Sequence, residues 1–185
     1  MEASVSILYA VMTVLSPMLT QFDMDVVAET DRDEIYCAAQ NIYFESRGEP
    51  DIGQVAVALV VLNRVNDRRY PNSVCGVVKQ SVKLSNGAPA RNKCQFSWYC
   101  DGLSDKPREK EAWAISVDVV YEAVNLYING YDIADQSTHY HAKNVRPYWS
   151  KDENMHYVES IDDHHFYRWR SYDWWRENYS HDYYD

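Results

Sequence analysis

The feature that most constrains the fold is a nearly uninterrupted apolar segment over residues 52–67, IGQVAVALVVLNRVND. Its apolar side chains would fall on all sides of a helix and not along a single stripe. Such a helix is stable only when neighbouring elements cover it. The segment therefore predicts a buried central helix. A chain of 185 residues with 46% hydrophobic content is long enough to build one globular core around it.

A second helix is predicted immediately upstream, ending near Arg47. Asp31 followed by Glu34 indicates a capping box at its start, and Asp51 followed by Gln54 indicates a second capping box at the start of the central helix. Apolar residues recur at helical spacing in the upstream segment: Ile35, Ala38, Ala39 and Ile42. The two helices should therefore meet at a break around Gly48.

The remainder of the chain is predicted to be mostly helical with a small strand region. Residues 73–80 indicate a short helix, and residues 81–105 an irregular region with a small hairpin. A long amphipathic helix should follow Pro107 and end at Asn129-Gly130. Residues 137–149 and 164–169 alternate as strands or extended segments do. The apolar stripe of the long helix consists of Trp113, Val117, Val120, Val124 and Tyr127.

The charge balance argues against nucleic acid as a partner. The formal net charge is −10 at pH 7, and the sequence contains no block of Lys or Arg. Electrostatic attraction to phosphates or to anionic lipid is therefore not expected.

The four cysteines, Cys37, Cys75, Cys94 and Cys100, contain no CxxC spacing. This disfavours a zinc ribbon and thioredoxin-type redox chemistry. Outside the reducing cytosol two disulfides would form, and the sequence leaves all three pairings open. Buried free thiols are the alternative.

An uncharged segment covers residues 3–22, close to the length needed to cross a bilayer. Polar residues and Pro17 dilute it, Glu2 stands where a signal peptide usually has a base, and the end of VVA at Ala28 is only a passable cleavage site. We expect residues 1–30 to be either a signal peptide or releasable membrane anchor, or an ordinary packed or partner-bound helix.

Glu45 is the first candidate for chemistry. A helical wheel places it at the rim of the apolar face near Ala38 and Ile42, so it should be half-buried in the last helical turn. Desolvation and the negative end of the helix dipole both raise the pKa of such a carboxyl, whereas Arg47 nearby would oppose the shift. A protonated carboxylic acid at a break between helices suits a general acid for glycosidic cleavage. The alternative is a solvated surface glutamate.

Glu49 is the natural candidate for a second carboxylate, since most glycosidases use a pair. However, Gly48 and Pro50 interrupt the helical register between Glu45 and Glu49. Glu49 could equally brace the loop or cap the next helix.

Five segments in this order resemble the SleB-type cell-wall hydrolases, which include spore-cortex-lytic enzymes and phage or proteobacterial homologues. The segments are NIYFESRGEPDIGQVAVALVVLNRV, PNSVCGVVKQ, CQFSWYCDG, THYHAKNVRPYW and HHFY, and the resemblance covers residues 35–167. It implies an α+β, lysozyme-like fold. We expect the catalytic domain over residues 31–170, between the leader and an aromatic, charged tail over 171–185 that departs from the spore enzymes.

The resemblance also implies an activity. Family members cleave the β-1,4 bond between N-acetylmuramic acid and N-acetylglucosamine in peptidoglycan, without a cofactor or metal. The family's essential glutamate falls on Glu45, which would protonate the leaving oxygen and then accept a proton from the C6 hydroxyl as a 1,6-anhydro ring closes. Substrate-binding positions implied by the family's motifs are Ser46, Gln95, Phe96, Ser97, Tyr140 and His141. Trp98 and Trp149 are expected in the core.

Two other classes of function stay open. A metal hydrolase would use His139 and His141 on one side of a strand, with Glu, His164 or His165 as further ligands. A non-catalytic glycan-binding or virion structural module would retain the scaffold alone. The leader suggests export to the periplasm or cell wall, tethering at the inner membrane, or carriage in a virion with partners bound through residues 1–30.

Overall fold

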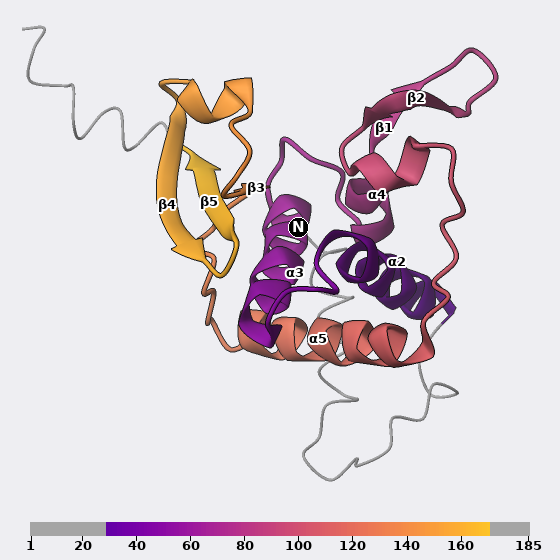
Figure 1. The fold of residues 1–185 in the computed structure, drawn as a ribbon, viewed down its shortest axis with the longest axis horizontal. Coiled ribbons are helices and arrows are strands. Elements are labelled where there is room, and N and C mark those ends of the chain that lie inside the picture. Colours follow the sequence, from indigo (N-terminus) through magenta and orange to yellow (C-terminus); the bar gives the residue numbers. More distant parts are fainter. Residues whose placement is uncertain (1–28, 171–185) are drawn as a thin grey trace, which may run out of the picture.

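The computed structural model describes residues 29–170, a helical body with two small sheets (Figure 1). The leader over residues 1–28 and the tail over 171–185 lie outside this description. Within residues 29–170, no helix has the length and apolar character needed to cross a membrane. The elements in chain order are α2 (Glu29–Glu45), α3 (Asp51–Asn66), α4 (Val74–Val78), β1 (Ser81–Lys83), β2 (Pro89–Cys94), η2 (Ser97–Cys100), α5 (Lys110–Ile128), β3 (His139–Ala142), η3 (Tyr148–Lys151), β4 (Met155–Ile161) and β5 (His164–Trp169).

Helix α3 is the buried centre of the molecule, as its sequence predicts. Every residue from 53 to 61 is buried, and α2, α4 and α5 all pack against the helix. The loop between β4 and β5 lies close to the first turn of α3. A Cβ atom on Gly53 would lie only 2.7 Å from Oδ2 of Asp162 in that loop. The sheet of β3, β4 and β5 therefore lies alongside this helix (Figure 1).

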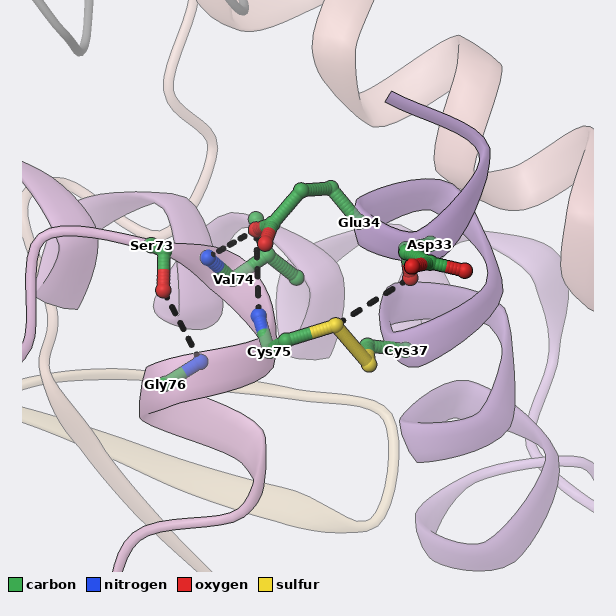
Figure 2. The surroundings of a disulfide bond; sticks show 7 residues. All are labelled: Asp33, Glu34, Cys37, Ser73, Val74, Cys75 and Gly76. Carbon is green, nitrogen blue, oxygen red and sulfur yellow. Dashed lines mark hydrogen bonds between the residues drawn. A yellow bond between two sulfur atoms is a disulfide. The ribbon is translucent and has the colours of Figure 1, made fainter. Parts of the chain in front are cut away.

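The predicted capping box at Asp31 and Glu34 is wrong. Helix α2 already includes Glu29, so Asp31 lies inside it. The carboxylate of Glu34 instead accepts hydrogen bonds from the backbone N–H groups of Val74 and Cys75, the latter at 3.1 Å (Figure 2). These are the free donors at the N-terminus of α4, where a negative charge is stabilised. Glu34 thus caps a helix that is distant in sequence.

The second predicted capping box is also wrong. The residue that precedes α3 is Pro50, and Asp51 is already the first helical residue. The side chain of Gln54 donates a 2.9 Å hydrogen bond back to the carbonyl of Glu49. Proline suits this position because its ring fixes φ and no N–H is needed there.

Two disulfides cross-link the helical body. Cys37–Cys75 joins α2 to α4, and Cys94–Cys100 joins the end of β2 to η2. This selects one of the three pairings that the sequence left open, and the alternative of buried free thiols is wrong.

The three-stranded sheet is antiparallel with strand order β3-β5-β4. Tyr140 pairs with Phe166 in the register, and both side chains turn toward the helical core. His141, one residue along, lies on the opposite face and stacks on Tyr167 with ring centroids 5.2 Å apart. Strands at 139–142 and 164–169 confirm the sequence prediction, whereas β4 was not predicted.

The predicted long helix and small hairpin are both confirmed. Helix α5 buries Val120 and Val124, while Trp113, Val117 and Tyr127 are partly buried against the core. Strands β1 and β2 pair antiparallel within the region predicted to be irregular.

Candidate active site

Glu45 is the last residue of α2 and lines a small cavity of about 130 Å³. Its side chain is half-buried, as the helical wheel predicts. The helix ends there because residues 46–48 form a turn before α3 begins, close to the predicted end. The remaining lining residues come from α3, the loop after β2, β3 and η3: Arg64, Gln95, Phe96, His139, Tyr140 and Trp149.

Burial raises the pKa of the Glu45 carboxyl, as predicted. Two contacts oppose this shift by stabilising the anion. The Tyr140 hydroxyl donates a 3.1 Å hydrogen bond to Oε2, and the positive charge of Arg64 acts across the cavity. Desolvation outweighs both, so the carboxyl holds its proton to a higher pH than an exposed glutamate would.

The expectation that Arg47 opposes this shift is wrong. The Arg47 guanidinium pairs with Glu109 at 3.4 Å and lies 4.7 Å from the centroid of the Tyr43 ring. It is held there because the turn after α2 directs it toward the start of α5. The cation that acts on Glu45 is therefore Arg64.

Arg64 is the principal site residue that the sequence analysis missed. It is buried, and its Nε donates a 2.6 Å hydrogen bond to the carbonyl of Thr138. When the side-chain amide of Gln95 is oriented with its oxygen toward Arg64, this oxygen accepts hydrogen bonds from the two terminal nitrogens of the guanidinium at 3.2 and 3.3 Å. The signal in the sequence was a single arginine within a helix that is predicted to be buried. A buried cation needs polar partners, so contacts to Arg64 from other segments were to be expected.

Three of the predicted substrate-binding residues come together at the cavity. Gln95, Phe96 and Tyr140 all line it. Phe96 is buried and lies 5.2 Å below the Arg64 guanidinium, whereas Gln95 is exposed. Ser97 is exposed on the same loop but does not line the cavity. Binding of substrate by these four residues stays a prediction.

Ser46 and His141 lie away from the cavity wall. The Ser46 hydroxyl is buried and donates a 3.3 Å hydrogen bond to the carbonyl of Ile42 in its own helix. His141 faces away from Tyr140, with Nε2 3.1 Å from the Tyr167 hydroxyl and Nδ1 2.9 Å from the Ala142 carbonyl. Their substrate-binding roles stay predictions.

The expectation that Trp149 belongs to the core is wrong, because it is only half-buried and lines the cavity. It precedes the irregular turn into β4, and its ring lies 5.1 Å from that of His139. The matching expectation for Trp98 is confirmed: the ring is buried, and its Nε1 donates a 3.1 Å hydrogen bond to Asn41.

The histidines do not assemble a ligand set. His139 and His141 share one face of β3, as the alternation predicts, but His164 lies on the other face with its ring 5.3 Å from that of Tyr140. Burial, together with the charges of Arg64 and Arg69, lowers the pKa of His139 to about 4. Across residues 29–170, no group of three or more His, Cys, Asp or Glu side chains is arranged to hold a metal ion. The described geometry therefore does not support the metal-hydrolase alternative.

Glu49 braces a loop and does not line the cavity. Its Oε2 accepts a 3.4 Å hydrogen bond from the backbone N–H of Asp163 and lies 3.9 Å from Nδ1 of His164. Both partners sit at the turn between β4 and β5. This favours the bracing role over that of a second catalytic carboxylate.

Solved structures define the class of fold. The chain is similar to the catalytic domain of the Bacillus cereus SleB protein, with TM-score 0.51, 28% identity, and coverage of 74% of this chain and 91% of that one. It is also similar to the catalytic domain of the germination-specific lytic transglycosylase SleB from Bacillus anthracis, with TM-score 0.53, 29% identity, and coverage of 76% and 96%. The expected α+β, lysozyme-like fold is thereby confirmed.

The family follows from the sequence comparison. The cell wall hydrolase family profile matches residues 48–167, and the chain belongs to this family. Glu45 lies just before the matched segment. Among curated relatives, the spore cortex-lytic enzyme of Bacillus subtilis (strain 168) is 35% identical over 108 residues, 58% of this chain and 28% of that protein. The spore cortex-lytic enzyme of Oceanobacillus iheyensis is 33% identical over 109 residues, which cover 59% of this chain and 32% of that protein. The matched region is thus about a third or less of these relatives.

Proposed function

We propose that the chain is a peptidoglycan-cleaving lytic transglycosylase that acts on the β-1,4 bond between N-acetylmuramic acid and N-acetylglucosamine. The observation that carries this proposal is Glu45, a half-buried carboxyl with a raised pKa that faces a cavity. A lone acid whose pKa is raised keeps its proton to higher pH and is therefore better able to protonate a leaving oxygen. Membership of the cell wall hydrolase family supplies the substrate class.

Glu45 has to serve in two protonation states in turn. As the acid it protonates the glycosidic oxygen, so the bond to C1 of N-acetylmuramic acid breaks and positive charge develops on that sugar. The carboxylate left behind is stabilised by the Tyr140 hydrogen bond and the Arg64 charge. It then removes a proton from the C6 hydroxyl of the same sugar as that oxygen bonds to C1. This returns the proton to Glu45 and closes the anhydro ring without water.

The surrounding residues support a single-carboxylate mechanism. The nearest other candidate, Glu49, is engaged with Asp163 and His164 at a turn. No second carboxylate lines the cavity among the described residues. A mechanism in which the substrate's own hydroxyl is the nucleophile requires none.

Export to the periplasm or cell wall is part of the proposal. Disulfides persist in oxidising compartments, and this chain has two that stabilise its helical body. The substrate of a cell wall hydrolase lies outside the cytoplasm. The proposed membrane tether or virion carriage depends on residues 1–30, most of which lie outside the described residues.

Turbidity loss of purified sacculi tests the proposal. Wild-type protein should clear the suspension, whereas Glu45→Gln should lose at least about a thousandfold in rate, because the donated proton is gone. Glu49→Gln, the same change four residues along, should retain most of the activity. Lysis by Glu45→Gln would overturn the assignment. Binding without lysis by the wild type would favour the non-catalytic glycan-binding module.

A further inference from the structure

A second, larger cavity of about 660 Å³ is lined by residues next to those of the catalytic cavity. Asn63 and Thr138 line the larger cavity, while the next residues along the chain, Arg64 and His139, line the catalytic one. Trp169 also lines the larger cavity, with its ring 5.5 Å from that of His139. A ligand that fills both cavities would therefore extend past the junction of α3 and β3.

The larger cavity is rich in arginine although the whole chain is acidic. Four arginines and only two aspartates line it, although the whole chain has a formal net charge of −10. The arginines come from the end of α3 and the end of β5: Arg68, Arg69, Arg168 and Arg170. We call this cavity the arginine pocket. Such a concentration of guanidinium groups predicts an anionic ligand.

The two acidic side chains in the arginine pocket are already engaged. Asp132 accepts from Asn63 Nδ2 at 2.9 Å and from the backbone N–H of Ala134 at 2.9 Å. Asp67 accepts from Nε of Arg69 at 2.9 Å. They therefore act as internal braces.

Arg68 is the cation most available to a ligand. It is exposed and forms no ion pair with any residue from 29 to 170, whereas Arg168 pairs with Asp135 at 2.9 Å. Its guanidinium can therefore bind a ligand without first breaking an internal ion pair.

We propose that the arginine pocket binds the carboxylates of the peptide stems that peptidoglycan carries on its N-acetylmuramic acid. The inference rests on the proposed function, because the stem reaches this pocket only when the glycan strand occupies the neighbouring cavity. An extended stem of four residues spans roughly 13 Å, so it can reach from a sugar at the catalytic cavity to residues that are next neighbours in the chain of that cavity's lining. Planar guanidinium groups bind carboxylates in a bidentate manner, which suits stems that carry several of them. The enzyme would then recognise peptide-bearing strands in preference to bare glycan.

Binding measurements on two matched ligands test this proposal. One ligand is a soluble glycan strand with intact stems, and the other is the same strand stripped of its peptides by an amidase. Using the Glu45→Gln protein to prevent cleavage, we expect tighter binding to the strands with stems. Arg68→Gln should weaken that binding about fivefold and should leave binding to stripped strands unchanged.

Arg108→Gln is the matched control, since Arg108 is exposed and lies outside the arginine pocket. Equal affinity for the two ligands, or an equal loss for both in the Arg68 variant, would overturn the inference. A fall in melting temperature of the unliganded Arg68 variant, without a change in binding, would assign the pocket to a segment of the chain itself.

Cleavage by the wild-type protein separates this inference from the proposed function. Cleavage of both ligands at rates that do not depend on Arg68 would overturn the stem site and leave the transglycosylase assignment intact. Absence of cleavage, with binding that still depends on Arg68, would overturn the assignment and leave the stem site.

Discussion

The Tyr140 hydroxyl donates a 3.1 Å hydrogen bond to Glu45, linking strand β3 to the last turn of helix α2 across 95 residues of sequence. This bond stabilises the ionised carboxylate and lowers the pKa of Glu45, against the larger raising effect of burial. The sheet therefore contributes directly to the protonation equilibrium of a residue on a helix.

Replacing Tyr140 with Phe should move the alkaline limb of the pH profile of kcat/KM to higher pH. The change removes the hydrogen bond but keeps the ring, so the pKa of Glu45 rises further and the acid stays protonated over a wider range. Measuring kcat/KM on soluble glycan strands across pH checks this. A limb that stays in place, or moves to lower pH, would show that Tyr140 does not act on Glu45.

Glu45→Gln should stabilise the protein at neutral pH. Because burial raises the pKa of Glu45 in the folded state, the stability contributed by this group is present below its ordinary value of 4.5 and lost as pH rises through the folded pKa. The amide carries no such penalty. We expect a higher melting temperature than that of the wild type at pH 7, and no gain below pH 4.5.

Thermal denaturation over this pH range, compared with Glu111→Gln on the exposed surface of α5, measures the effect. A gain that is the same at every pH would contradict the assigned cause.

The sequence predicts those parts of the fold that depend on local pattern. The uniformly apolar segment of α3 can only be a buried helix, and the stripe along α5 can only face a core. Glu45 was identifiable because its burial follows from its place on a helical wheel. These features require no knowledge of how distant segments meet.

Other parts depend on tertiary contacts and could not be predicted. Glu34 has the spacing of a local cap, yet it binds the N-terminus of α4 because Cys37–Cys75 holds the two helices together (Figure 2). Arg64 becomes a site residue only once Thr138 and Gln95 approach it. In strand β4 the adjacent exposed residues Glu159 and Ser160 interrupt the alternation that would have marked it as a strand.

The two disulfides should contribute differently to stability and activity. Cys37–Cys75 closes a separation of 38 residues and Cys94–Cys100 one of 6, so loop-closure entropy gives about 4 and 2 kcal/mol respectively. We expect the double Ala variant of the first pair to lose more in melting temperature. The double Ala variant of the second pair should lose less stability but more activity than the first, because it frees the loop that carries Gln95 and Phe96.

Denaturation and sacculus clearing by both variants, at a temperature where each is folded, would separate the two effects. A larger loss of stability from the short loop would contradict the entropic account.

Glu34→Ala should destabilise the fold by about 1–2 kcal/mol, since two N–H groups at the start of α4 lose a charged acceptor. Asp33→Ala is the matched control, because the Asp33 side chain is exposed and turns away from this contact (Figure 2). Chemical denaturation of both variants measures the difference. Equal stability of the two would show that the cap contributes nothing.

Mass spectrometry of the muropeptides released from sacculi, digested in heavy-oxygen water, tests the single-carboxylate mechanism most directly. Our account predicts products that end in 1,6-anhydro-N-acetylmuramic acid, lighter by one water than hydrolysis products and free of the heavy isotope at the cleaved end. Products with a reducing end that carries the heavy oxygen would contradict it, because water and not the C6 hydroxyl would then have been the nucleophile.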